Sequence, residues 1–157
     1  MNAANPRFLT DAMLIRLARW LRALGYDTLD CPGANDAQLV ARANDQQRWL
    51  LTRDRALLSE LRPATALYIV SQQPLEQLGQ VLSHFQLTPT HIPFSRCMLC
   101  NRPLVLLSPD VSLPTYASHR TNELCKRCPA CNRVYWFGAH ANRMTQTLNR
   151  AGLLPPG

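Results

Sequence analysis

Residues 7–31 read RFLTDAMLIRLARWLRALGYDTLDC, and this stretch decides the fold class. The short apolar run at 7–11 predicts a strand. Residues 13–25 predict an amphipathic helix, because their leucines recur at helical spacing on one face while arginines occupy the other. Gly25 is a typical residue at the end of a helix. Residues 26–31 predict a second strand, so the chain begins with strand, helix and strand.

The same alternation continues outward to residue 85. Further strands are expected at 48–52 and 66–70, and further helices at 36–47, 54–61 and 74–85. Asp36 and Asp54 stand where they would cap the first two of these helices. Four rounds of strand and then helix predict an α/β domain over residues 1–88, with a parallel sheet and helices on both faces. Ligands of such sheets gather beyond the carboxyl ends of the strands.

The pattern changes after Gln86, where LTPTHIPF reads as a linker. A small cysteine-rich module is expected at 93–144, and residues 145–157 are expected to form a flexible tail. Residues 1–90 carry nine Arg against eight acidic residues, whereas 91–157 carry seven Arg and one Lys against one Asp and one Glu. The basic second part suggests a polyanionic partner such as nucleic acid. The alternative is that arginine usage reflects a GC-rich genome, and charge alone does not decide between them.

Two segments of this second part have the same outline, R-C-x-x-C-N-R. They are RCMLCNR at 96–102 and RCPACNR at 127–133. Two residues between thiolates place both sulfurs on one tetrahedral ion, and asparagine tolerates the left-handed backbone that the next position often needs. The repeat predicts one structural zinc ion, with no position open for substrate. Its expected ligands are Cys97, Cys100, Cys128 and Cys131.

The two remaining cysteines, Cys31 and Cys125, lack these surroundings and are assigned as non-ligands. A thioredoxin-like redox pair would follow an early strand of the α/β domain, which these motifs do not. Paired C-x-x-C motifs favour metal over disulfides in a reducing compartment. The N-terminus has no basic, apolar secretory signal, and no apolar run approaches the roughly 20 residues of a membrane span. We therefore expect a cytoplasmic protein that does not bind membranes.

Three aspartates share a setting at the expected strand ends. Asp11 closes the first strand, Asp54 follows the third, and Asp36 opens the helix between the second and third. Parallel topology would bring all three to one edge of the sheet, where their mutual repulsion calls for a cation. Oxygen ligands suit Mg²⁺ or Mn²⁺, which can activate water against a phosphodiester. The alternative is that each aspartate merely caps its own helix.

The runs FLTDAMLIRLARWLRALGYDTL, NDAQLVARAN and WLLTRDRALL resemble the PIN-like ribonuclease domain of the Mut-seven C-terminal (Mut-C RNase) family. FSRCMLC, RCPACNRVYWFGAH and NRM resemble the zinc ribbon attached to that domain. The resemblance covers about residues 7–144. It implies that Asp11, Asp36 and Asp54 bind a divalent metal and cleave single-stranded RNA. The chain departs from the pattern in having no match for a further acid, and Ser71-Gln72-Gln73 offers no carboxylate after the fourth strand.

Substrate contacts are expected from basic and polar side chains near these motifs. The candidates are Arg19, Arg22, Thr52, Arg53, Arg133 and His140. A solvated helix face is the alternative for Arg22, and a structural histidine is the alternative for His140. Tyr135, Trp136 and Phe137 would either stack on bases or form the core of the module. The sequence thus predicts a Mg/Mn-dependent ribonuclease with a basic zinc ribbon. The alternatives are a non-catalytic RNA-binding adaptor and a toxin-like nuclease that cuts one specific RNA.

Overall fold

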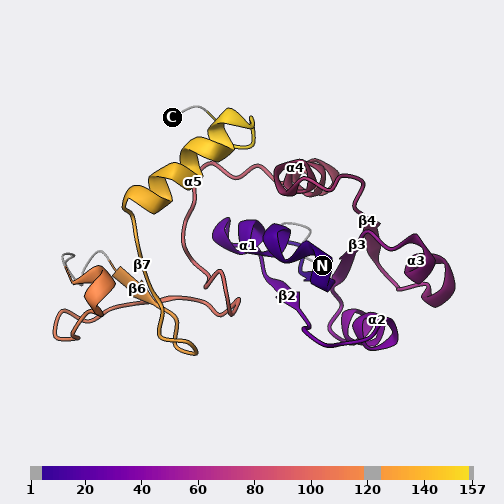
Figure 1. The fold of residues 1–157 in the computed structure, drawn as a ribbon, viewed down its shortest axis with the longest axis horizontal. Coiled ribbons are helices and arrows are strands. Elements are labelled where there is room, and N and C mark those ends of the chain that lie inside the picture. Colours follow the sequence, from indigo (N-terminus) through magenta and orange to yellow (C-terminus); the bar gives the residue numbers. More distant parts are fainter. Residues whose placement is uncertain (1–4, 119–124, 156–157) are drawn as a thin grey trace. The chain divides into compact units, whose positions relative to one another are not determined.

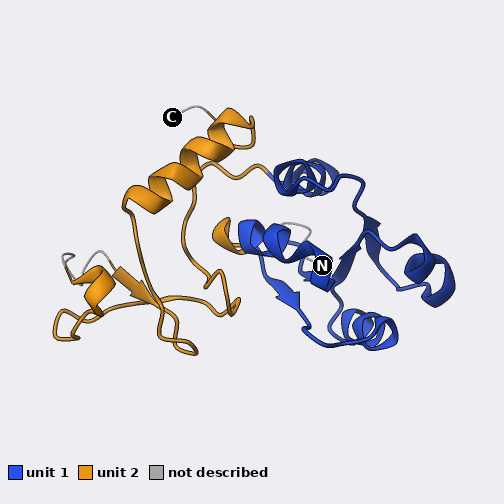
Figure 2. Ribbon diagram, viewed as in Figure 1, with its two compact units in different colours: residues 1–21, 26–87 blue, residues 22–25, 88–157 orange. Residues whose placement is uncertain are grey.

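The computed structural model describes residues 5–118 and 125–155. The chain divides into two compact units (Figures 1 and 2). Unit 1 contains residues 1–21 and 26–87, and unit 2 contains residues 22–25 and 88–157. None of the described helices combines the length and apolar character needed to cross a bilayer.

Unit 1 is the expected α/β domain. Its strands are β1 (Phe8–Thr10), β2 (Thr28–Asp30), β3 (Trp49–Thr52) and β4 (Ala66–Tyr68). Its helices are η1 (Ala12–Leu14), α1 (Ile15–Ala23, whose last two residues fall in unit 2), α2 (Asp36–Asp45), α3 (Arg55–Leu61) and α4 (Pro74–His84). All strand pairs are parallel, in the order β2-β1-β3-β4. The predicted fold class is confirmed.

Helices cover both faces of this sheet (Figure 1). On one face, Leu9 and Leu50 pack in a buried cluster with leucines, Val40 and Ala43 of α2 and α3. On the other face, the ring of Phe8 meets Phe85, at the end of α4, with centroids 5.2 Å apart. Successive strand residues point to opposite faces, so the adjacent apolar residues of β1 serve both layers. The helices after β1 and β3 lie on opposite faces, which makes the β1–β3 pair the topological switch point of the sheet.

Arg48, which precedes β3, connects the starts of three strands. Its buried guanidinium donates to both carboxylate oxygens of Asp27, at 2.7 and 3.3 Å, and to the carbonyl of Phe8 at 3.1 Å. A planar guanidinium matches a carboxylate in this two-point manner. The pair therefore fixes the entry of the chain into β1, β2 and β3.

The cap of α2 differs from the prediction. Asn35, not Asp36, is the N-cap: its side chain accepts the N–H of Gln38 at 2.8 Å, and the Gln38 side chain accepts the N–H of Asn35 at 2.9 Å. This reciprocal capping box satisfies two otherwise unpaired amides. Asp36 is the first helical residue and is exposed, so its carboxylate is not used as the cap.

Unit 2 is built on an antiparallel sheet with the strand order β5-β6-β7. Its elements are β5 (Val105–Leu106), η2 (Thr115–Ala117), β6 (Cys125–Arg127), β7 (Val134–Trp136) and α5 (Ala139–Arg150). A small core joins Leu107, Ala117, Cys125 and Val134. The flexible tail expected at 145–157 is wrong for its described part, since α5 continues to Arg150 and Leu148 is fully buried.

Candidate metal centre and sheet edge

The two C-x-x-C-N-R segments fold into the same turn. In the first, the N–H of Cys97 donates to the carbonyl of Arg102 and the N–H of Asn101 donates back to Cys97. The second repeats both bonds, between Cys128 and Arg133 and between Asn132 and Cys128. Asn101 and Asn132 have φ values of 64° and 62°, in the left-handed region that asparagine tolerates. The predicted role of the asparagines is confirmed.

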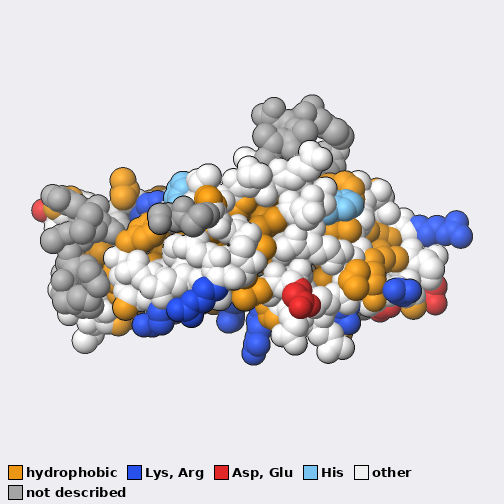
Figure 3. Space-filling model, turned by 90° about the horizontal axis from the view of Figure 1, so that it is seen from above, with side chains coloured by type: hydrophobic (Ala, Val, Ile, Leu, Met, Phe, Trp, Pro, Cys, Tyr) orange, Lys and Arg blue, Asp and Glu red, His pale blue; other side chains and the backbone are white. Residues whose placement is uncertain are grey.

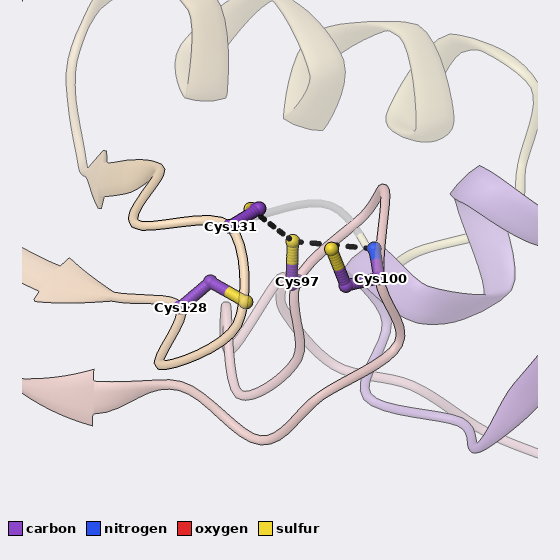
Figure 4. Close-up of side chains that lie close together, drawn as sticks. All are labelled: Cys97, Cys100, Cys128 and Cys131. Carbon is purple, nitrogen blue, oxygen red and sulfur yellow. Dashed lines mark hydrogen bonds between the residues drawn. The ribbon is translucent and has the colours of Figure 1, made fainter.

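The four cysteine sulfurs of the two turns point toward one another (Figure 4). All four Sγ atoms lie within 4.8 Å of each other, and those of Cys97 and Cys131 are 3.7 Å apart. Zinc–sulfur bonds of 2.3 Å in a tetrahedron place sulfurs roughly 3.8 Å apart. The cluster therefore fits a zinc ribbon and could hold one structural zinc ion.

The thiols are not alike in acidity. Burial alone would raise the pKa of Cys97, but hydrogen bonds from the Tyr135 hydroxyl and from the N–H groups of Cys100 and Leu99 outweigh it and lower the pKa to about 7. Burial, the hydrogen bond with Cys131 and the charges of neighbouring sulfurs raise the pKa of Cys100 to about 12. Four thiolates at this spacing repel each other, so the fully ionised cluster needs a cation.

Two side chains outside the cluster fix the first turn. The Tyr135 hydroxyl lies 3.2 Å from Sγ of Cys97 and accepts the N–H of Met98 at 3.0 Å. Arg22, which belongs to unit 2, donates to the carbonyls of Met98 and Leu99 at 2.9 and 3.3 Å. Such partners of metal ligands orient them and tune their basicity. No sequence pattern predicted either contact, because the partners are far apart in the sequence.

The two cysteines assigned as non-ligands lie outside the cluster. Cys125 is fully buried among Leu107, Ala117 and Val134. Cys31 is half-buried and packs against the core of unit 1 beside α2. Among the described residues the four-cysteine group is the one set of three or more potential ligands that meets the 4.8 Å spacing.

A second group of polar residues lies at the carboxyl edge of the parallel sheet, at the switch point. The hydroxyl of Thr52, the last residue of β3, donates to Oδ2 of Asp11 at 2.7 Å and accepts the N–H of Asp54 at 3.0 Å. Oδ1 of Asp11 caps η1 by accepting the N–H of Met13, and Oδ1 of Asp54 caps α3 by accepting the N–H of Leu57. The structure thus connects Asp11 and Asp54 through Thr52, while both also serve as caps.

Asp36 completes the trio expected from the sequence, but the structure does not gather the three. Among the residues that the structure describes, no set of three carboxylates meets the 4.8 Å spacing. The donor set consists of carboxylate oxygens, which is the kind that Mg²⁺ and Mn²⁺ prefer. Its chemistry fits such an ion, whereas the side-chain positions do not form a ready three-carboxylate site.

The residues expected to contact substrate have separate surroundings. Arg22 is only 2% exposed, which corrects both the solvated face and the phosphate contact expected for it. Thr52 is fully buried, so its hydroxyl orients Asp11 and is not open to substrate. Arg53 donates to the carbonyls of Ile69 and Val70 beyond β4. The remaining three, Arg19, Arg133 and His140, are exposed.

The aromatic run after the second turn is divided among different roles. Tyr135 is buried against Cys97. Trp136 stacks with Tyr116 at a centroid distance of 6.0 Å, and Phe137 packs edge-on against Phe94 at 5.3 Å. No sequence motif singled out Tyr116, which precedes the second cysteine motif by more than ten residues and contacts Val134 and Trp136 only through the fold.

Comparison with known proteins assigns the chain to a family. The Mut7-C RNAse domain family matches residues 6–148. The chain belongs to this family. Membership in the Mut7-C RNAse domain family implies a nuclease-like function on RNA and confirms the resemblance noted from the sequence motifs. No curated protein and no solved structure matches the chain.

Proposed function

We propose that the protein is a Mg/Mn-dependent ribonuclease that hydrolyses phosphodiester bonds of single-stranded RNA. Asp11, Asp36 and Asp54 would hold the divalent ion, and the basic unit 2, with its structural zinc, would help to bind the RNA. One observation carries the proposal: in a chain of the Mut7-C RNAse domain family, Asp11 and Asp54 follow neighbouring parallel strands at the switch point and are connected by Thr52. This edge is where open α/β sheets bind their ligands.

The chain's own residues prepare the edge for this role. Thr52 holds Oδ2 of Asp11, and the cap bonds hold one oxygen each of Asp11 and Asp54, so neither carboxylate rotates freely. Asp36 has no side-chain bond among the described residues and, freed from capping by Asn35, can turn toward a ligand. When bound, a divalent ion neutralises carboxylate and phosphate charge and activates water.

The first test incubates the purified protein with labelled single-stranded RNA and Mn²⁺, and compares it with Asp54→Asn. Asparagine caps helices about as well as aspartate, so this substitution removes the charge and keeps the fold. We expect cleavage by the original protein and its loss in the variant. Mn²⁺ binding measured by electron paramagnetic resonance should weaken in parallel, which provides a readout that does not depend on activity.

The second candidate function is an RNA-binding adaptor without catalysis. It is favoured by the separation of the carboxylates, by the capping bonds of Asp11 and Asp54, and by the absence of an acid in Ser71-Gln72-Gln73. Under that reading the protein binds RNA, shows no metal-dependent cleavage, and is unaffected by Asp54→Asn. Binding of RNA without cleavage at any Mn²⁺ concentration would replace the ribonuclease with the adaptor.

A further inference from the structure

A groove of about 490 Å³ lies in unit 2, between the segment around η2 and the second cysteine turn. Its described lining includes Leu113, Pro114, Tyr116, Arg127, Arg133 and the expected zinc ligand Cys131. Ligand pockets for small molecules begin at about 300 Å³. The groove therefore has room for a single nucleotide unit of a longer strand.

The charge of the groove is positive. Among the described residues that line it, Arg127 and Arg133 are basic and none is Asp or Glu. Within the described residues neither guanidinium makes a hydrogen bond or an ion pair, unlike Lys126, whose ammonium donates to the carbonyls of Pro93 and Phe94. Lys and Arg side chains also gather on part of unit 2 in the left half of Figure 3. Two guanidiniums at one groove, without a partner in the part of the chain that the structure describes, suit the phosphates of a polyanion.

The aromatic side of the groove is fixed in place. The Tyr116 ring lies nearly parallel to that of Trp136, at an interplanar angle of 25°, and the Tyr116 hydroxyl accepts the N–H of Val134 at 3.1 Å. Although its ring packs on Trp136 and its hydroxyl is hydrogen-bonded, Tyr116 remains 52% exposed. A rigid exposed ring loses little entropy when a base stacks on it, and an acidic peptide would gain nothing comparable from it.

We propose that this groove binds one nucleotide of single-stranded RNA, with its base on Tyr116 and its phosphates on Arg127 and Arg133. The inference rests on the proposed function, since it takes RNA as the ligand, and it names where unit 2 holds the strand. Asn132, which also lines the groove, offers an amide for contacts with a base edge.

The test measures the binding of a fluorescently labelled oligouridylate to the full chain by anisotropy, without added Mg²⁺ or Mn²⁺. Arg133→Gln and Arg127→Gln should each weaken binding about fivefold and reduce the slope of log K against log salt by about 0.7, the contribution of one phosphate contact on a single strand. Tyr116→Leu should weaken it about tenfold, as loss of one stacked base does, whereas Tyr116→Phe, which keeps the ring, should bind nearly normally.

Arg102→Gln is the matched control. Arg102 occupies in the first turn the position that Arg133 occupies in the second, is exposed, and does not line the groove. Its loss removes the same charge from unit 2, so it reports any general electrostatic effect. Elemental analysis should find the same zinc content in every variant, which shows that the cysteine cluster is intact.

The outcomes separate this inference from the proposed function. Equal weakening by Arg102→Gln and Arg133→Gln would show diffuse attraction and overturn the groove, as would binding of polyglutamate through the same arginines with no binding of RNA. If the groove variants cleave RNA and bind it with unchanged affinity, the proposed ribonuclease activity would be supported and the proposed binding of RNA in the groove would be wrong. Groove-dependent RNA binding without cleavage would support the groove and count against the ribonuclease.

Discussion

The hydroxyl of Tyr135 is one group on which the acidity of a candidate zinc ligand depends. Removing it with Tyr135→Phe should raise the pKa of Cys97 from about 7 toward its ordinary value of 9.0. The pKa of Cys97 in the folded protein lies below the ordinary value of 9.0. The stabilisation that the fold gives to the Cys97 thiolate is therefore complete above pH 9.0 and is lost as the pH falls through about 7. The variant should therefore release zinc at a higher pH and bind it about tenfold more weakly.

Zinc release can be followed against pH with a chromophoric chelator. Tyr116→Phe removes the other described tyrosine hydroxyl of unit 2, which bonds to the backbone of Val134 and not to a sulfur. It should release zinc like the original protein. Identical release curves for Tyr135→Phe and the original protein would show that the hydroxyl does not support Cys97.

Thr52 connects Asp11 to Asp54 through one buried hydroxyl. Thr52→Val keeps the shape but leaves Oδ2 of Asp11 and the N–H of Asp54 without this partner. We expect a loss of about 1–3 kcal/mol in the free energy of unfolding, measured by urea denaturation, and a fall in RNA cleavage. Thr52→Ser restores the hydroxyl and should recover most of both. A valine variant as stable and active as the original protein would contradict this role.

For single residues, predictions from the sequence were right where the conformation depends on a local motif. They were wrong where two neighbouring residues can fill the same role. The left-handed asparagines follow from the motif itself, since the turn requires φ values that few side chains tolerate. The cap of α2 was misassigned because Asn35 and Asp36 are both good caps, and Gln38 decides in favour of Asn35 through the second bond of the capping box. Arg22 could not be placed, because its partners lie 76 and 77 residues away.

At the scale of elements, the starts of β1, β2 and β3 depend on one ion pair. Asp27→Ala would leave the buried guanidinium of Arg48 without its carboxylate. Removing one partner of a buried ion pair leaves the other charge buried without a counter-charge. We therefore expect destabilisation of about 3 kcal/mol, measured as a lower midpoint of urea denaturation. Asp45→Ala, at the exposed end of α2, should change stability little. Equal midpoints for the two variants would show that the pair adds nothing.

The element that the sequence did not predict is α5. Its buried residues Ala141, Met144 and Leu148 have helical spacing, but threonines and asparagines between them are weak helix formers and no side chain caps its start at Gly138. The packing of its apolar face stabilises α5 although the helix propensity of its residues is low. By contrast, α1 and α4 carry leucines through every turn, and their existence was predictable from the chain alone.

For the whole molecule, topology was predictable and side-chain convergence was not. Alternating strands and helices require a parallel sheet, and a parallel sheet brings Asp11 and Asp54 to one edge. Whether Asp36 joins them depends on side-chain positions that no periodicity encodes, and among the described residues the structure does not gather the three. The cysteines were easier to predict than the aspartates, because each C-x-x-C turn is local and already holds two sulfurs close together. Only the approach of one turn to the other depends on the fold.

Zinc removal should affect the two units unequally. The cluster that packs around β6 and β7 contains four buried residues among those described, and we expect so small a cluster to depend on a bound metal. Unit 1 has its own core on both faces of its sheet. After chelation, hydrogen exchange should become fast in β6 and β7 and stay slow in β1 and β3. Cys128→Ser should reproduce this pattern and bind no zinc, whereas Cys31→Ser should bind the one zinc per chain that we expect. Unchanged protection of β6 and β7 in metal-free protein would show that the apolar core alone holds unit 2 together.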